Sequence, residues 1–427
     1  MGGGLLQLVA YGAQDAYLSG NPQITFWRGL FKRHTNFAME PFRVNLTGQA
    51  NWGTKHSAIL GRHADLVGPA YIEVEMPGDG NALVYSTDSR AGFNLIEYVE
   101  LDIGGQVIDR QYGEFLSIWS QLSLDLTKNA NLISINSVSN VANQACNTTT
   151  GRPRRNNVTY IPLGFWFCRN PGAALPLIAL QYHEVKINIL WNKTSLIFTD
   201  ATSDTISAGP AQANLLIDYI YLDVEERRRM AQESHEYLIE QTQYNEDKGL
   251  TSAQNRVDLT FNHPVKELIW VTQQSGRKNC RIKREQMGSL VSFVAPLDYD
   301  PIIYDCNLQL NGQDRMQALP GKYFSQVQAF QHHTGNGRVN PVGTSGSGIV
   351  PGILGIYMYS FAIKPEEHQP SGTCNFSRID TATLVFSVDG GVLINNLDEN
   401  NYDIRVYAIN YNILRIMSGM GGLAYSN

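Results

Sequence analysis

The sequence has few cysteines, few charged residues and no long apolar run. Its five cysteines form no CxxC pair and no zinc-binding spacing, and such an odd, sparse set is typical of reduced thiols in a cytosolic setting. No apolar run reaches the length of a membrane span, and the N-terminus shows no signal-peptide pattern. Charged residues make up 17% of the chain and the net charge is −6, which argues against a protein that coats nucleic acid.

Residue spacings typical of active sites are also missing. The Gly-rich stretches around Gly335 and Gly343 lack the strand-to-helix context and the Lys-Ser/Thr pair of a phosphate loop. His332 and His333 are adjacent, so their side chains would diverge in a strand, and no third ligand stands at metal-binding spacing. We therefore expect no catalytic residue, no cofactor and no metal, and we do not expect an enzyme.

What the sequence does contain is turn residues and short apolar segments. The 427 residues exceed one ordinary core and fit two domains of roughly 200 residues. Thirty-eight glycines and 17 prolines, with abundant Asn, Ser and Thr, indicate many turns between short strands. The composition therefore predicts an all-β protein.

One stretch of the chain occurs twice. Residues 101–110 and 308–315 each have the pattern of a strand, a tight turn and a return strand, and each is followed by an aromatic-rich run. Asn-Gly and Gly-Gly tolerate the positive φ that a two-residue hairpin needs. The repetition predicts two tandem domains of one design. The expected hairpin turns are Gly104, Gly105, Asn311 and Gly312.

Each half contains about eight short strands, no βαβ rhythm and loops of very unequal length, which matches an eight-stranded jelly roll, although the pattern alone leaves Ig-like sandwiches open. We expect a helix over residues 112–126, a short solvated helix over 225–233 and a long surface loop over 128–160. The predicted domains are an N-terminal arm (1–40), a first jelly roll (41–224), a linker (225–240) and a second jelly roll with a C-terminal tail (241–427).

Several loop features have two interpretations. The basic clusters at 152–155 and 277–284 could contact phosphate, sulfated glycan or an acidic partner, but solvated loop charge is the favoured interpretation. Five N-x-S/T sequons are present, and Asn147 and Asn157 in the long loop are the candidate glycosylation sites. The aromatic and basic residues over 24–33 either pack under the first domain, which we favour, or tie neighbouring subunits together.

Several motifs resemble those of a known family, from the first residues to the last and in register. The matching segments are Asn21–Phe26, Thr35–Ala38, Leu175–Val185, Gln369–Asp380 and Asn410–Tyr425. They resemble the major capsid proteins of nucleocytoplasmic large double-stranded DNA viruses, the chlorella-virus and iridovirus group, and are most similar to the phycodnavirus (chlorella-virus) protein.

The resemblance implies a double jelly roll, two eight-stranded sandwiches with short helices in the loops and an N-terminal arm. It also implies that three chains form a pseudo-hexameric capsomer, that capsomers tile an icosahedral shell over an internal membrane, and that minor capsid proteins are further partners. The protein is then expected in the virion after assembly in the host cytoplasm, near the membrane without spanning it and without direct contact to nucleic acid. The outward loops would be 128–160, 199–213, 273–288 and 331–351.

Two rival functions stay open at this point. One is a minor or penton-type capsid paralogue with the same fold. The other is a jelly-roll carbohydrate-binding protein, which would need an exposed aromatic platform. Trp52, near Asn51 and Gly53, is the only tryptophan outside an apolar segment and is the one candidate for that platform.

Overall fold

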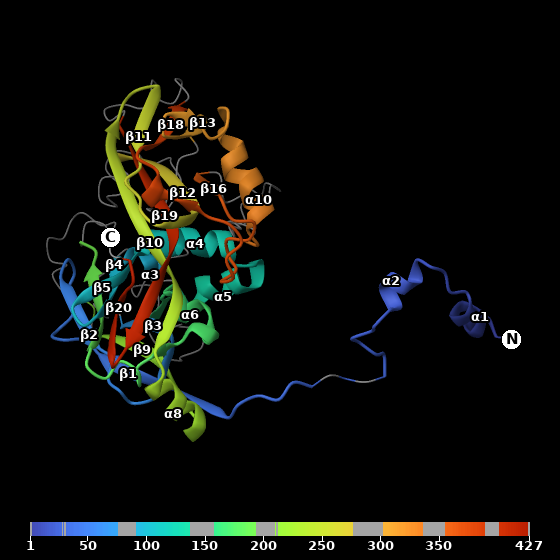
Figure 1. Ribbon diagram of the computed structural model, residues 1–427. Helices are drawn as coiled ribbons and strands as arrows, with labels where there is room; N and C mark the ends of the chain where they lie inside the picture. Colours follow the sequence, from blue (N-terminus) through green and yellow to red (C-terminus); the bar gives the residue numbers. More distant parts are fainter. Residues whose placement is uncertain are drawn as a thin grey trace, which may run out of the picture. The chain divides into compact units, whose positions relative to one another are not determined.

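The structure, a computed structural model, forms two compact units, Met1–Phe37 and Ala38–Asn427 (Figure 1). It describes residues 2–27, 29, 31–75, 91–136, 158–193, 210, 212–275, 302–335, 355–388 and 401–425.

The first unit carries two short helices, α1 (Gly3–Val9) and α2 (Asp15–Ser19), and neither has a buried residue. α2 ends just before Gly20, and α1 begins at Gly3 although residues 2 to 4 are all glycine. The helix-forming residues that follow, Leu5 to Leu8, outweigh the low helix propensity of glycine.

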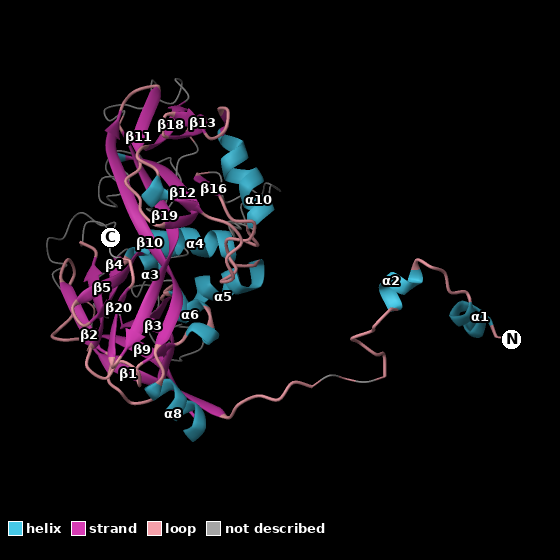
Figure 2. Ribbon diagram, viewed as in Figure 1, coloured by secondary structure: helices cyan, strands magenta, loops and turns pink. Residues whose placement is uncertain are grey.

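The second unit has two halves: the first half runs from β1 to β9 and the second half from β10 to β20. The first half is a sandwich of two antiparallel sheets (Figure 2). One sheet has the order β1 (Phe37–Asn45), β9 (Gln212–Leu222), β3 (Leu66–Glu75), β6 (Val158–Pro162), with β7 (Leu175–Pro176) beside β3. The other has the order β2 (Lys55–Ile59), β8 (Val185–Trp191), β4 (Ile96–Ile103), β5 (Gln106–Tyr112).

The second half repeats the strand order of both sheets and adds the short strands β15 and β20, which confirms the predicted double jelly roll. One sheet has the order β10 (His235–Leu250), β19 (Tyr402–Met417), β12 (Pro264–Gln274), β16 (Ile356–Ser360), with β17 (Cys374–Asn375) beside β12 and β20 (Met420–Leu423) beside β19. The other has the order β11 (Gln254–Asp258), β18 (Ala382–Val388), β13 (Ile303–Leu310), β14 (Gln313–Asp314), with β15 (Leu319–Pro320) beside β13.

The two repeated hairpins occupy equivalent places in the two halves. Gly104 and Gly105 join β4 to β5 with φ of +62° and +88°, and Asn311 and Gly312 join β13 to β14 with φ of +51° and +75°. Asparagine and glycine adopt this left-handed region most readily, which is why these residue types stand at the turns.

Helices fill the connections, in part where loops were expected. They are α3 (Ala91–Asn94), α4 (Gly113–Ser123), α5 (Leu126–Asn136), α6 (Trp166–Arg169), α8 (Val224–Gln232) and α10 (Gln328–His332), with the short turns η2 (Pro171–Ala173), η4 (Tyr323–Val327, π-helical) and η5 (Phe376–Arg378). The expected loop over 128–160 is wrong at both ends, because α5 runs to Asn136 and β6 begins at Val158. The helix expected over 112–126 is present but ends at Ser123, where Leu124 turns extended.

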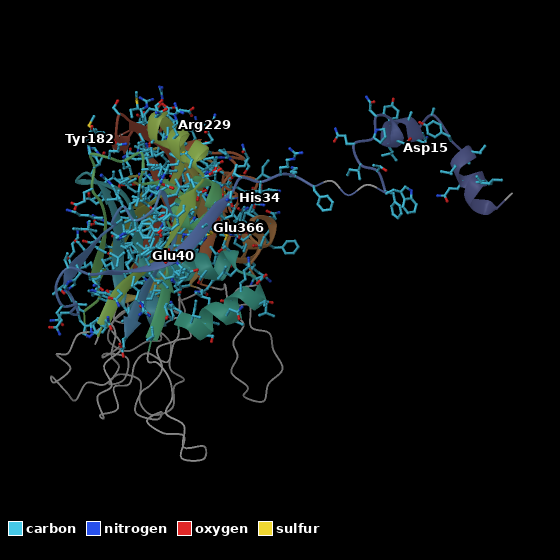
Figure 3. All side chains as sticks on the ribbon, turned by 90° about the horizontal axis from the view of Figure 1, so that it is seen from below. Asp15, His34, Glu40, Tyr182, Arg229 and Glu366 are labelled. Atoms are coloured by element: carbon cyan, nitrogen blue, oxygen red, sulfur yellow. The ribbon has the colours of Figure 1, made fainter. Side chains whose placement is uncertain are left out.

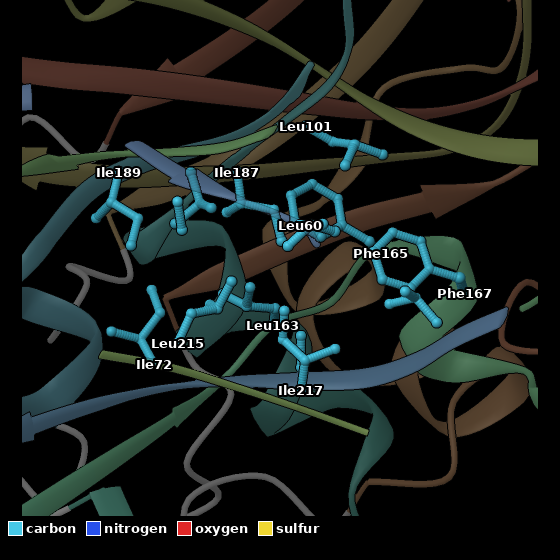
Figure 4. Close-up of a cluster of buried hydrophobic side chains, with 14 of the residues drawn as sticks. Leu60, Ile72, Leu101, Leu163, Phe165, Phe167, Ile187, Ile189, Leu215 and Ile217 are labelled. Carbon is cyan, nitrogen blue, oxygen red and sulfur yellow. The ribbon is translucent and has the colours of Figure 1, made fainter. Parts of the chain in front are cut away.

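Apolar side chains from both sheets fill each sandwich. In the first half, Ile72, Ile187 and Ile217 are fully buried and meet between the sheets (Figure 4). Each is an inward member of an alternating strand, which is the pattern that half-buried strands require. Trp270 and Phe386 play the same part in the core of the second half.

Two long strands are shared by both halves (Figure 1). β10 and β19 each have 16 residues and pair antiparallel, with His235 opposite Ile416 and Asp247 opposite Ile404. Ile239 and Ile416 belong to the core of the first half, whereas Ile404 belongs to that of the second. Strands of this length extend about 50 Å, so one ladder of hydrogen bonds fixes the orientation of the two halves.

Candidate assembly site: the junction between the two halves

Helix α4 of the first half packs on the outer face of the second-half sheet β10-β19-β12-β16, and we call this contact the junction. The helix begins tightly against the end of α3 and the start of β4: a Cβ on Gly113 would lie 2.3 Å from Phe93 O and 2.4 Å from Ile96 O, so only glycine fits. The apolar side of the helix, the sheet face and one residue of α10 (Gln328–His332) form one buried cluster: Phe115, Ile118, Leu122, Ile269, Val271, Ala329, Ile356, Met358, Tyr407 and Ile409.

A buried ion pair fixes the N-terminal turn of α4. Arg405 on β19 is 1% exposed; its Nε donates to Glu114 Oε2 at 2.7 Å and its Nη2 donates to Oε1 at 2.7 Å. The Tyr407 hydroxyl donates to the same carboxylate at 2.6 Å. Burial and the nearby Glu114 charge raise the pKa of Tyr407 well above its usual value, so this hydroxyl stays a donor. The pair therefore sets both the position and the rotation of the helix.

A second charged group surrounds Trp119, at the middle of α4. The Arg169 guanidinium lies 4.6 Å from the ring centroid and the Lys266 Nζ lies 5.9 Å from it. Both cations reach Glu240 on β10, Arg169 at 3.2 Å and Lys266 at 2.7 Å. Burial lowers the pKa of Lys266, and the Glu240 carboxylate opposes this change. Arg169 belongs to the first half and the other two ionic residues to the second, so the group joins the halves.

His333 completes the ionic set from the other end of α4. Its Nε2 lies 2.6 Å from Glu267 Oε1, and its Nδ1 lies 2.9 Å from Glu366 Oε1 (Glu366 is labelled in Figure 3). Burial disfavours the charged imidazole, but the two carboxylates outweigh burial and raise the pKa of His333 to about 9. When His333 is protonated, it is the third cation of this group, after Arg169 and Lys266. The three positive charges then balance the negative charges of three glutamates, Glu240, Glu267 and Glu366.

The segment after His333 also binds the C-terminal end of α4. The last carbonyls of a helix have no partner within the helix. Gly335 N donates to Leu122 O at 2.7 Å, and the Thr334 hydroxyl lies 3.0 Å from Ser123 O. A Cβ on Gly335 would lie 2.2 Å from Leu122 O, so the approach again depends on glycine. Both ends of α4 are thus held by the second half.

The edge strand β5 adds one more contact between the halves. Asp109 Oδ1 accepts a hydrogen bond from Thr242 N of β10 at 3.0 Å, and its Oδ2 accepts one from Gln111 at 3.1 Å. Burial raises the pKa of Asp109 to about 6, although both hydrogen bonds favour the charged form. This carboxylate is therefore close to titration at neutral pH.

The residues singled out from the sequence lie elsewhere. Asn147, Asn157 and both basic clusters lie outside the described residues. His332 and His333 do not lie in a strand, as the sequence analysis assumed, but at the end of α10, where His332 Nδ1 lies 3.0 Å from Ile363 O. Within the described ranges no group of His, Cys, Asp and Glu side chains has the arrangement of a metal site.

No sequence motif pointed to the junction. The available signal was charge in segments that otherwise read as buried: Glu114 in an apolar helix, Lys266 and Glu267 in β12, and Arg405 in β19. Charged residues are rarely buried unless they are paired, so such positions mark ion pairs whose partners lie far away in the sequence.

Two models of known protein families match the chain. Residues 25–223 match the family model for the N-terminus of the major capsid protein, and residues 226–422 match the model for the major capsid protein of large eukaryotic DNA viruses. The chain belongs to this family. It is 44% identical to the major capsid protein of Pyramimonas orientalis virus and 37% identical to that of Paramecium bursaria Chlorella virus 1, and each alignment covers 100% of both chains.

Solved capsid proteins share the fold as well. The VP54 protein of PBCV-1 is 32% identical, with a TM-score of 0.74 over 94% of this chain and 100% of VP54. The Faustovirus major capsid protein shares the fold at 11% identity, with a TM-score of 0.71 over 95% of this chain. The resemblance drawn from the sequence motifs is thus confirmed, and this capsid protein belongs to a family of structural proteins.

Proposed function

We propose that three copies of this capsid protein form a pseudo-hexameric capsomer, and that capsomers tile an icosahedral shell around an internal membrane. The observation that carries the proposal is that two sandwiches with the same strand order lie within a single compact unit. A threefold assembly of such chains presents six similar sandwiches, so that it can fill a hexagonal site.

The junction supports this proposal because it holds the two sandwiches at one angle. A chain whose halves moved independently could not present six sandwiches at equal angles. Here the shared strands β10 and β19, the buried pair of Glu114 with Arg405 and the apolar cluster around Leu122 all oppose such movement. One relative with 32% identity is described as part of a PBCV-1 capsid model, which also favours self-assembly.

The remaining parts of the proposal concern partners and place. Residues 1–40 would act as an arm on the inner side, 41–224 and 241–427 as the two jelly rolls, and 225–240 as the linker. Minor capsid proteins would be further partners in the virion, with assembly in the host cytoplasm. No helix among the described residues is long and apolar enough to cross a membrane. The net charge of −6 disfavours direct binding of nucleic acid.

Two alternatives differ in their support. A minor or penton-type paralogue shares the fold, so that only the stoichiometry in the particle separates it from the main proposal. The carbohydrate-binding alternative needs an exposed aromatic side chain, and Trp52 does not provide one. Trp52 is 7% exposed and packs edge-on against Trp191, with ring centroids 5.8 Å apart. The exposed tryptophan is instead Trp27, in the first unit.

Sedimentation of the purified chain tests the proposal. We expect a stable trimer of about three times 47.6 kDa, and electron microscopy of particles should show threefold capsomers on hexagonal sites. A monomer at micromolar concentration would contradict it. Removal of residues 1–20 should leave trimers intact but weaken shell assembly, whereas loss of soluble trimer would assign the arm to the fold.

A further inference from the structure

The second half carries its own version of helix α4. The continuous helical segment η4–α10 (Tyr323–His332) follows the second hairpin as α4 follows the first. Its first turn is as tight: a Cβ on Gly321 would lie 2.1 Å from Ile303 O, at the start of β13, as one on Gly113 would lie 2.4 Å from Ile96 O, at the start of β4. Gly113 and Gly321 are therefore equivalent positions in the repeat.

Counted from these glycines, the outer faces of the two helices differ in what covers them. Trp119 and Leu122 follow Gly113 by about six and nine residues, and the second half of the chain covers them. Val327 and Phe330 follow Gly321 by the same steps, yet Val327 is 39% exposed and Phe330 is 90% exposed. An aromatic side chain this exposed on an ordered helix, beside a second apolar group, is typical of a contact surface.

We propose that this face of η4–α10 binds the first half of a second copy of the chain, on the outer face of the sheet β1-β9-β3-β6. The contact would repeat between copies the contact that α4 makes within one copy. This inference rests on the proposed self-assembly and adds which surfaces meet.

The receiving sheet has the same construction in both halves. β3 and β12 each have a register shift near their start, after which Tyr71 pairs with Leu216 and Ile269 pairs with Tyr407. Ile269 and Tyr407 are covered by α4. Their counterparts Tyr71 and Leu216 are only half-buried, and Met39 on the neighbouring edge strand β1 is 51% exposed. The first half therefore has the equivalent face available.

The charges at the starts of the two helices differ in sign. The residue after Gly113 is Glu114, and it pairs with Arg405, two positions before Tyr407 on β19. The residue after Gly321 is the exposed Lys322, and the position on β9 that corresponds to Arg405 is the uncharged Asn214, two positions before Leu216. A lysine beside Arg405 would be repelled, so this charge disfavours binding of η4–α10 to the second-half sheet and leaves the first-half sheet as its receiver.

Sedimentation velocity over a dilution series tests the inference with Phe330→Ser. Because Phe330 is exposed, the variant should fold, and the melting temperature of the dilute, dissociated chain should be unchanged. We expect the dissociation constant of the trimer to rise by about thirtyfold or more, the effect of removing a central aromatic contact. Tyr304→Ser is the matched control, since Tyr304 on β13 of the same half is 70% exposed and lies outside the proposed face.

Phe330→Ser trimers of unchanged affinity would overturn the inference. If those trimers failed to build shells, the face would serve contacts between capsomers. A monomeric wild-type chain would instead contradict the proposed function itself.

Discussion

Helix α4 and the segment η4–α10 are equivalent helices of the two halves, and they lie in different environments. Both follow a hairpin, and both start with a glycine pressed against the first strand carbonyl. Leu122 on the first is fully buried, whereas Phe330 on the second is 90% exposed. The comparison teaches that the repeated framework is set by backbone contacts, and that the outer face of each copy is set by its neighbour.

The two sheets that face these helices differ in the same way. The second-half sheet presents Ile269, Val271 and Ile409, which are buried from the moment the chain folds. The first-half sheet presents Tyr71 and Asp218 instead, a mixture that can meet water before a partner arrives. Permanent contacts are more apolar than contacts that form after folding, so the difference is expected if the two faces are covered at different stages.

Removal of the charged residue at the start of each helix should give the largest difference in stability between the two helices. Glu114→Ala should lower the free energy of unfolding by about 3–5 kcal/mol, because Arg405 would stay buried without its carboxylate. Lys322→Ala should change it by less than about 0.5 kcal/mol, since the lysine is exposed. Urea unfolding of the dilute chain measures both. Equal losses would show that the two positions are not in different environments.

Truncation of the apolar faces should give the next largest effect. Leu122→Ala opens a cavity in the junction, and we expect a loss of about 2–5 kcal/mol. Phe330→Ala should leave the unfolding of the dilute chain nearly unchanged and act only on association. A loss for Phe330→Ala close to that for Leu122→Ala would mean that the aromatic ring is buried within its own chain.

Raising the pH should weaken the junction, because His333 loses its positive charge there. His333 has a folded pKa of about 9 against an ordinary value of 6.5, so its charge stabilises the fold fully below pH 6.5. That contribution, roughly 3 kcal/mol, is lost as the pH rises through about 9. The groups that face His333 are Glu267 from β12, Glu366 from the following loop and Trp119 from α4.

Unfolding measured between pH 6 and 10 checks this expectation. His333→Gln should remove most of the decline, whereas the exposed His34→Gln should leave it unchanged. A decline of the same size in both variants would assign it to other groups.

The smallest expected difference lies in the hairpin turns. Gly312→Ala should cost about 1–2 kcal/mol, the strain of a side chain at φ +75°, because nothing lies within 4 Å of the new Cβ. Gly104→Ala carries the same strain and also places its Cβ 2.6 Å from the His183 ring, so it should lose more. Thermal melting of both variants gives the order, and a reversed order would contradict the packing of His183 on the first turn.

Much of the fold could be predicted from residues that act locally. Hairpins are predicted at Gly104–Gly105 and Asn311–Gly312 because few other residue types adopt positive φ. The long-range pairings could not be predicted in this way. The bond from Glu114 to Arg405 spans most of the chain, and neither residue has a neighbour in sequence that indicates the other. Trp52 shows the reverse error, since a polar sequence neighbourhood concealed a buried tryptophan.

The sequence by itself determined that the chain is β-rich, duplicated and a member of a capsid protein family, because turn chemistry, strand alternation and motif order are written along the chain. Only the tertiary structure decided that α4 is enclosed while η4–α10 is open, and that β10 and β19 run through both halves. The physical reason is that burial and ion pairing depend on which surfaces meet in space, and the two copies of one pattern meet different surfaces.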